Sequence, residues 1–335
     1  MAISVNFTMP VFNRLQCTQM ALLQLRKSSR TIPFSITVVD NGSEDVVTDK
    51  LREFHKAGII DHLFLLPQNM GIAAACNIGW ELVDADVYCK LDNDTMPVRR
   101  DWLEILFRMW AHGKPFSNLG YAASEQQMLA NKNYLQTEHG ILGICDTTLA
   151  GTGIFIPKNV HRVLGYWNEE YGLYGAEDGD YGVRMKYVEF EQYYYPRSKF
   201  IRYDLDDELN EAAYVQHGLD KKAERQTFKR DKNGYFGRFG INCFLYNYHI
   251  RSPRVCRRYK IVDIDENHHV RLAEREEYRE VDAAVQECSR IICKTHMERG
   301  PLALEDGKLH ERLKTLMRGC GQDTESFMTA LRDLS

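Results

Sequence analysis

In the first hundred residues, short apolar runs rich in β-type residues alternate with segments of helical periodicity. This alternation is typical of βαβ units, which build a mostly parallel sheet covered by helices. We therefore expect an α/β fold with a Rossmann-like arrangement at its start. The expected strands lie at residues 3–8, 35–39, 63–66, 87–91 and 153–156, and the expected helices at residues 17–27, 72–83, 102–110 and 183–187.

The composition is that of a soluble globular protein. Of the 335 residues, 44% are hydrophobic and 27% are charged, which excludes disorder and a fibrous repeat. The net charge of −4 gives no sign of an overall polyanion-binding surface. Nine cysteines without a CxxC pair suit a reducing compartment. Since the N-terminus lacks a signal peptide pattern and no apolar run approaches about 20 residues, we expect a cytoplasmic protein without a transmembrane segment.

Polar clusters follow two of the expected strands where each strand ends. The run Asp40-Asn41-Gly42-Ser43 follows the second strand, and Asp92-Asn93-Asp94 follows the fourth. Ser43 is expected to cap the next helix. Open α/β sheets bind ligands beyond the carboxyl ends of their strands, so we expect both clusters to face one pocket.

The acidic trio at residues 92–94 has the chemistry of a cation site. Two carboxylates that flank one residue suit Mg²⁺ or Mn²⁺, and such an ion bridges phosphate oxygens. Asp is also a common turn and helix-cap residue, so the trio by itself leaves a structural role open.

Five separate motifs stand in an order that resembles an inverting family-2 glycosyltransferase of the GT-A fold. The resemblance covers about residues 3–220 and leaves the C-terminal third outside it. The motifs are Pro10 with Asn13-Arg14, the run from Asp40 to Ser43, Asn69-Met70-Gly71 with Asn77-Ile78-Gly79, the acidic trio, and the segment 165–170 that leads to Glu177-Asp178-Gly179-Asp180 and Arg184.

The resemblance implies a metal-dependent transferase that moves a sugar from a nucleoside diphosphate sugar, UDP- or GDP-linked, to an acceptor hydroxyl with inversion. It implies that Asp40 contacts the nucleobase or ribose and that Asn69 and Gly71 lie at the phosphates, where a helix N-terminus favours anions. It implies that Asp94 ligates Mn²⁺ or Mg²⁺ directly, while Asp92 binds the metal through water or binds the ribose. The further donor-binding residues implied are Pro10, Asn13, Arg14 and Asn93.

The same resemblance assigns the acceptor side. An inverting displacement needs a general base opposite the leaving group. Asp178 is the candidate base, and Glu177 either raises its proton affinity or binds the acceptor. Both could instead cap the helix that carries Arg184. Asn168 departs from the family pattern, in which Asp commonly precedes the Glu.

Histidines and a basic run complete the candidate residues. His217 lies where many family members place a histidine that completes the metal site, although a structural role is equally open. His268 and His269 are expected to be solvated in a hairpin turn. The basic run at residues 251–260 is expected either to contact phosphates of an acceptor, such as nucleic acid or a lipid-linked sugar, or to form an exposed connector.

The expected domains are a glycosyltransferase domain at residues 1–250 and a smaller C-terminal extension at 251–335. The donor-binding part covers about residues 1–100 and the acceptor part about 101–250, while the extension is expected to hold a hairpin followed by helices.

The acceptor is left open as a glycan, lipid, protein or modified nucleic acid. Alternative functions are a retaining transferase on the same fold, a sugar nucleotidyltransferase and a non-catalytic carbohydrate-binding protein. No GxGxxG follows the first strand and no GxxxxGK[ST] occurs, which disfavours a dehydrogenase and a P-loop enzyme.

Overall fold

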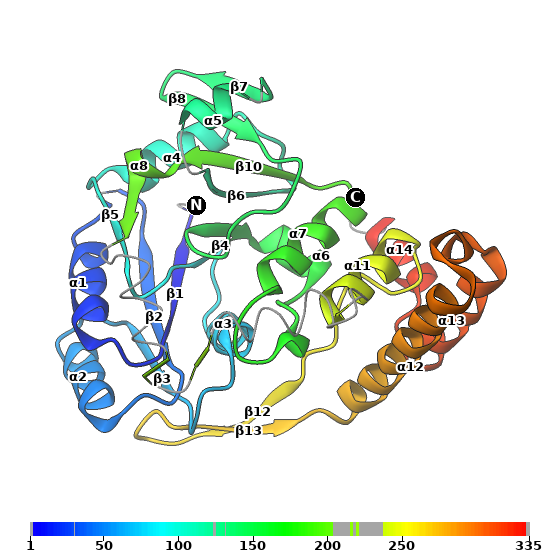
Figure 1. Cartoon of the computed structure of the whole chain (residues 1–335). Coiled ribbons are helices and arrows are strands. Elements are labelled where there is room, and N and C mark those ends of the chain that lie inside the picture. Colours follow the sequence, from blue (N-terminus) through cyan, green and yellow to red (C-terminus); the bar gives the residue numbers. More distant parts are fainter. Residues whose placement is uncertain are drawn as a thin grey trace.

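A computed structural model describes residues 3–332 except 30, 123, 124, 131, 204–214, 217, 218 and 221–236. Within this part of the chain, a sheet of nine strands runs through the molecule in the order β3-β2-β1-β4-β9-β6-β10-β8-β7 (Figure 1). The first four of these strands are parallel, and β9 is antiparallel to both of its neighbours. The fold class expected from the sequence, a mostly parallel sheet flanked by helices, is confirmed.

The N-terminal half supplies the parallel part of the sheet and its helices. Their bounds are β1 Val5–Val11, α1 Leu15–Arg26, β2 Phe34–Asp40, α2 Asp45–Lys56, β3 His62–Leu65, α3 Ile72–Leu82, β4 Val87–Lys90, β5 Thr95–Pro97 and α4 Trp102–Trp110. The strands and helices expected in this half are present with small shifts of their ends. One detail is wrong: Glu44, not Ser43, precedes α2, and the Ser43 hydroxyl accepts a hydrogen bond from the Asn13 amide at 2.7 Å instead.

The middle of the chain extends the sheet beyond β4. Its elements are β6 Ser117–Ala122, α5 Glu125–Ala130, β7 Tyr134–Thr137, β8 Gly140–Ile144, β9 Ile154–Pro157, α6 Lys158–Leu164, η1 Glu169–Tyr171, α7 Glu177–Tyr187, β10 Glu191–Pro196, α8 Arg197–Phe200 and β11 Ile201–Tyr203. The short strand β11 pairs with β5 in a separate two-stranded sheet. The helix expected at residues 183–187 begins six residues earlier, at Glu177.

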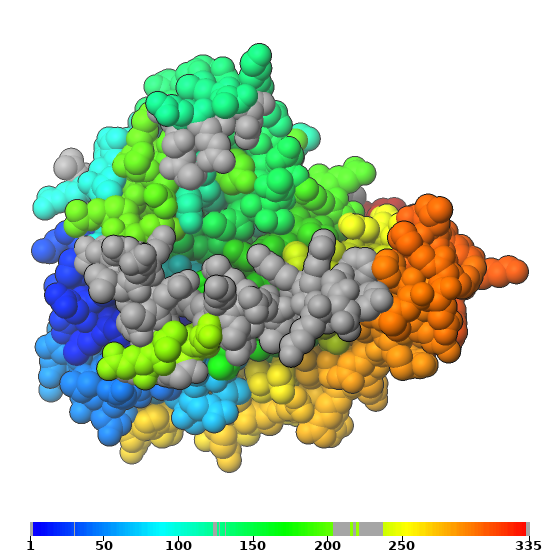
Figure 2. Space-filling view, viewed as in Figure 1, coloured from blue at the N-terminus to red at the C-terminus, as the bar shows by residue number. Residues whose placement is uncertain are grey.

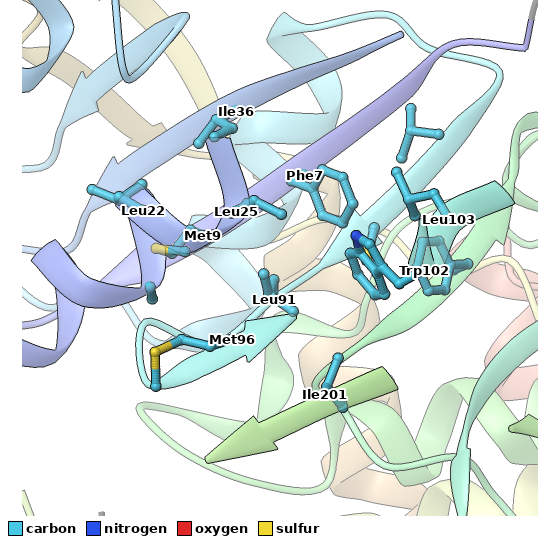
Figure 3. Packing of buried hydrophobic residues seen from close by; sticks show 14 of the residues in the cluster. Phe7, Met9, Leu22, Leu25, Ile36, Leu91, Met96, Trp102, Leu103 and Ile201 are labelled. Carbon is cyan, nitrogen blue, oxygen red and sulfur yellow. The ribbon is translucent and has the colours of Figure 1, made fainter. Parts of the chain in front are cut away.

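Strand alternation explains how the sheet is covered on two faces. Phe7 and Met9 of β1 pack with Leu22 and Leu25 of α1 and with Trp102 of α4 (Figure 3). Residues of α3, α6 and α7 form a second cluster on the opposite face, which includes Cys76, Val160 and Met185. Because side chains alternate between the two faces of a strand, these two clusters bury apolar side chains on both faces of the sheet.

The C-terminal part consists of α11 Arg238–Asn247, β12 Tyr259–Ile264, β13 Val270–Glu274, α12 Glu276–Arg299, η2 Pro301–Glu305, α13 Gly307–Gly319 and α14 Thr324–Arg332. The hairpin β12–β13 runs along the base of the molecule, below the blue N-terminal segments, and α12 and α13 stand at its side (Figures 1 and 2). Among the described residues, no helix is long and apolar enough to cross a membrane.

Two expectations about this C-terminal part are wrong at least in part. His268 and His269 lie in the expected hairpin turn and His269 is exposed, but the His268 side chain is half-buried, because its ring packs edge-on against His55. The His268 carbonyl accepts a hydrogen bond from the Leu65 amide. In the basic run, Arg251 and Arg257 belong neither to an exposed connector nor to a phosphate-binding surface. Arg251 and Arg257 are 0% and 5% exposed, and each is paired with a buried glutamate.

Candidate active site

The loops that follow β1 and β2 are fastened to each other. Asn13 and Arg14 adopt the left-handed backbone conformation after β1. This turn lets the Asn13 amide donate to Ser43 Oγ, while Asn13 Oδ1 accepts from the Glu44 amide at 2.9 Å. Asn13 therefore holds the loop after β2 in place, a role that its short amide side chain performs from within a turn.

The loop after β3 is joined to the loop after β2 in a similar way. Asn41 Nδ2 donates to Asn69 Oδ1 at 2.9 Å, and Asn41 Oδ1 accepts from the Met70 amide at 2.8 Å. Asn69 Oδ1 also accepts from the Gly71 amide at 3.0 Å. These bonds fix the backbone that leads into α3, whose N-terminus carries the positive end of the helix dipole.

These loops and the turn after β4 surround one cleft. The wall opposite the strand ends comes from residues between η1 and α7. The cleft is lined by Pro10, Val11, Phe12, Asn41, Asn69, Ile72, Asp92, Asn93, Leu173, Tyr174 and Leu219. The sequence singled out four of these side chains for donor binding. It missed the apolar and aromatic ones, for which the only signal was the aromatic segment before Glu177.

Asp40 lies at the end of β2 and is 1% exposed; its neighbour Asn41 lines the cleft, whereas Asp40 itself does not. Burial raises the pKa of this carboxyl to about 6, although hydrogen bonds from Ser43 and Gly42 oppose the shift. The Ser43 amide donates to Oδ2 at 3.2 Å, whereas Oδ1 is buried and has no hydrogen-bond partner among the described residues. A buried acceptor of this kind is costly unless a donor completes it, so Asp40 suits a ligand that brings an N–H or O–H group.

The acidic trio lies between two cationic side chains. Arg14 Nη1 lies 3.0 Å from Asp94 Oδ2, and Lys90 Nζ contacts Asp92 Oδ1. Burial disfavours the charge on Lys90, but Asp92 outweighs it and holds the pKa of the ammonium above its ordinary value. Asn93 lines the cleft, and its amide donates to Thr18 Oγ1 at 2.9 Å. The turn is thus rigidly attached to α1 and β4.

The candidate catalytic pair opens α7 directly after Ala176, which has a left-handed backbone. Asp178 Oδ1 accepts from the Gly179 amide at 2.7 Å, as a residue in a helix's first turn can. Glu177 is buried, and this burial, assisted by the charge of Asp178, raises the pKa of Glu177 to about 7. Glu177 also interacts electrostatically with Lys90 and Asp92.

The segment Gly151-Thr152 lies between the two groups of carboxylates. A Cβ added at Gly151 would lie 3.3 Å from Asp178 Oδ2, and Thr152 Oγ1 accepts from the Asp92 amide at 2.9 Å. The structure therefore brings Asp178 close to the turn that carries Asp92, although 86 positions separate them in the chain. A side chain at Gly151 would therefore require the Asp178 carboxylate to shift by a few tenths of an ångström.

The donor atoms fit a divalent cation chemically. Asp92 and Asp94 supply hard carboxylate oxygens, and one oxygen of each is paired with a cation, Lys90 or Arg14. The described residues contain no group of three or more His, Cys, Asp or Glu side chains that could hold a metal ion. The candidate third ligand, His217, lies outside the described residues.

Residues 7–137 match the family model described as Glycosyl transferase family 2. The match contains the loops after β1 to β4 and ends before α7. The prediction that the chain is a glycosyltransferase enzyme is confirmed at the level of this domain. No curated protein matches the chain significantly.

Several solved glycosyltransferase structures resemble the chain distantly. TarS of S. aureus is 14% identical, with a TM-score of 0.47, over 66% of this chain and 41% of its own. The mannosyltransferase PcManGT from Pyrobaculum calidifontis, in complex with GDP-Man and Mn²⁺, is 15% identical, with a TM-score of 0.49, over 74% of this chain and 72% of its own. GalNAc-T7 with UDP, GalNAc and Mn²⁺ is 13% identical, with a TM-score of 0.47, over 58% of this chain and 43% of its own. The chain thus spans less than half the length of TarS and of GalNAc-T7.

Proposed function

We propose that the protein transfers a sugar from a nucleoside diphosphate sugar to an acceptor hydroxyl with inversion at the anomeric carbon. The observation that supports this most strongly is the shared cleft. Loops after all four parallel strands meet there, and the segment Gly151-Thr152 joins the Asp92 turn to the Glu177–Asp178 pair. Such a site has separate places for a base, a diphosphate and an attacking hydroxyl.

In this proposal the donor nucleotide lies over the ends of β1 and β2. Asp40 Oδ1 accepts a hydrogen bond from the base or ribose, which completes its buried acceptor. The N-terminus of α3, held by Asn69 and Gly71, faces the diphosphate. A divalent cation, Mn²⁺ or Mg²⁺, held by Asp94 and Asp92, would act as a Lewis acid towards the leaving diphosphate when bound.

Asp178 takes the proton of the acceptor hydroxyl. The acceptor oxygen forms the new bond to the anomeric carbon as the bond from that carbon to the diphosphate oxygen breaks, and the electron pair leaves with the diphosphate. Glu177 carries a raised pKa beside Asp178, which makes it suited to donate a hydrogen bond to the acceptor while protonated. Lys90, paired with Asp92, balances the charge of that carboxylate throughout.

The test is a screen of UDP- and GDP-linked sugars with Mn²⁺ or Mg²⁺, in which released nucleoside diphosphate is measured. We expect slow donor hydrolysis with one nucleotide, abolished by Asp178→Asn. Product anomeric configuration, read by NMR once an acceptor is found, separates inversion from retention. If the protein binds a donor but neither hydrolyses it nor transfers its sugar to any acceptor offered, a non-catalytic binding protein is favoured and the proposal is wrong.

The acceptor belongs to the glycans, lipids, proteins or modified nucleic acids, and burial of Arg251 and Arg257 removes the reason for favouring nucleic acid. We also place the protein in the cytoplasm. Its nine cysteines, all within the described part of the chain, form no disulfide with one another, as expected for a chain that folds in a reducing compartment.

A further inference from the structure

A single loop, residues 172–176, connects the wall of the donor cleft to the candidate base. Leu173 and Tyr174 line the cleft, and the loop leads directly into Glu177 and Asp178. Within it, Gly172, Gly175 and Ala176 have φ values of 70°, 108° and 64°. Glycine adopts positive φ freely, whereas Ala176 persists there only where its surroundings hold it, so the position of the loop depends on its anchors.

The two ends of this loop are bonded to each other. The Tyr171 hydroxyl, just before the loop, donates to Asp180 Oδ2 at 2.6 Å, and Asp180 lies in the first turn of α7. The Arg184 guanidinium donates to the other oxygen of Asp180, also at 2.6 Å. Any shift of η1 is therefore transmitted to the turn that carries Asp178.

The C-terminal part of the chain holds this arrangement through Glu170. Glu170 Oε2 accepts from Arg238 Nε at 2.8 Å, and Glu170 Oε1 accepts from Arg251 Nη2 at 2.5 Å. Asn242 Nδ2 donates to the Tyr171 hydroxyl at 2.8 Å, while Asn242 Oδ1 accepts from Arg251 Nη1 at 2.7 Å. We call Glu170, Arg238, Asn242 and Arg251 the Glu170 network.

The ion pair at the centre of this network is deeply buried. The side chains of Arg251 and Glu170 are 0% and 1% exposed. Burial opposes ionisation, but Arg238 and Arg251 hold the pKa of Glu170 well below its ordinary value. Buried ion pairs give little net stability compared with apolar residues of similar volume, because desolvation offsets the attraction. What they do provide is fixed, directional geometry, since the arginine guanidinium is planar and binds through two nitrogens.

We propose that Arg251 is a positioning residue of the transfer reaction. Through Glu170 and Asn242 it holds the 172–176 loop in one position, and this position places both the donor-cleft wall and Asp178. This inference rests on the proposed function. It makes the C-terminal part a component of the catalytic machinery, although its arginines touch neither donor nor acceptor. The basic run that the sequence singled out thereby acquires an internal role.

The experiment compares Arg251→Met and Arg251→Lys with the wild-type protein, with kinetics expressed per folded molecule from circular dichroism. For Arg251→Met we expect kcat/KM for the donor to fall about tenfold or more, with both a raised donor KM and a lowered kcat, because small misplacements of catalytic groups cost orders of magnitude. Arg251→Lys keeps the charge but not the paired hydrogen bonds, so it should recover part of the loss. The matched control is Arg290→Met, which removes an exposed ion pair with Glu287 on α12.

The outcomes separate this inference from the proposed function. If folded Arg251→Met keeps kcat and donor KM within about twofold of wild type, Arg251 is only structural and the inference is wrong. If Arg251→Met does not fold, Arg238→Met replaces it, because the Arg238 side chain is 16% exposed and less costly to remove. Arg238→Met is then expected to raise the donor KM and lower kcat in the same way, and unchanged values of both constants overturn the inference. Failure of the wild-type protein to release nucleoside diphosphate from any donor would overturn the proposed function, and the inference with it.

Discussion

Asp178 and Glu177 are adjacent in the chain, yet their surroundings assign them different chemistry. Glu177 is buried next to Lys90, whereas Asp178 is half-buried and reaches the segment Gly151-Thr152. Two carboxyls whose environments differ in this way are typical of sites that need both a proton acceptor and a proton donor.

Replacing Asp178 with Asn tests the base directly. We expect kcat for transfer to fall by about 10²–10⁴-fold, the usual contribution of a positioned general base, with the donor KM changed by less than about threefold. Steady-state kinetics under saturating acceptor measure both constants. Asp263→Asn, an exposed aspartate in β12, is the control and should leave both unchanged. Wild-type kcat in Asp178→Asn would exclude it as the base.

The buried carboxyl of Asp40 predicts a pH dependence of donor binding. Burial raises its pKa to about 6, so Asp40 is an ionised acceptor above that pH and is protonated below it. Affinity for the free nucleoside, which carries no titrating phosphate, should therefore fall as the pH drops from 8 to 5. Titration calorimetry at both pH values measures this. Asp40→Asn should bind weakly at both, and a variant that keeps the wild-type pH dependence would show that another group titrates.

At the scale of elements, the site depends on close backbone contacts between loops. Gly71 precedes α3 with φ of 90°, and a Cβ added there would lie 2.2 Å from the Gly172 carbonyl oxygen. The Ile72 amide also faces the Leu173 carbonyl at 3.3 Å. The N-terminus of α3 and the 172–176 loop are thus in direct contact, so only glycine fits at residue 71.

Gly71→Ala should act on both stability and donor binding. Backbone strain alone costs about 1–2 kcal/mol of unfolding free energy, and displacement of the loop adds to this and raises the donor KM. Gly58→Ala is the matched control, because Gly58 has φ of 72° but nothing within 4 Å of an added Cβ. Urea unfolding and donor kinetics should show the strain cost in both variants and the raised KM only in Gly71→Ala. Equal donor KM values in the two variants would contradict the proposed loop contact.

Local patterns predicted most of the elements because their causes are local. Apolar periodicity predicted β1 to β4, α1, α3 and α4, and the observed ends of these elements differ from the predicted ones by a few residues. The hairpin and the helices after residue 255 were also expected. Periodicity missed the start of α7, because its first turn holds Glu177, two aspartates and a glycine, which resemble a loop. Asp180 in this turn is instead bonded to Tyr171 and Arg184.

At the scale of the whole molecule, the Glu170 network joins residues 81 positions apart and attaches the C-terminal helices to the acceptor side of the site. Around it, α11 and α12 share a cluster with α13 that includes Leu245, Val285 and Leu313. The orange helices in Figure 2 therefore form a support for the site through this network and cluster.

Glu170→Gln tests the contribution of this network to stability. Since the folded pKa of Glu170 is depressed, its ionic contribution is present above its unfolded pKa and is lost as the pH falls through the folded value. At pH 7 the variant should lose about 3–5 kcal/mol of unfolding free energy, because Arg251 stays buried without its paired carboxylate, whereas Arg238 keeps Asp282. Urea unfolding at pH 7 and in strong acid should show this difference shrinking as wild-type Glu170 protonates. A difference independent of pH would contradict the ionic role.

The sequence by itself determined the order of strands and helices in the first 110 residues and the polar clusters at the strand ends. These depend on side-chain periodicity and turn chemistry within a few residues, so they can be read from a local pattern. Only the tertiary structure decided that Asp178 meets the Asp92 turn through Gly151, that Leu173 and Tyr174 complete the cleft, and that Arg251 and Arg257 are buried. The local sequence around an arginine does not show whether its side chain faces water or a buried glutamate. Its partner is chosen by packing between segments that no local rule connects.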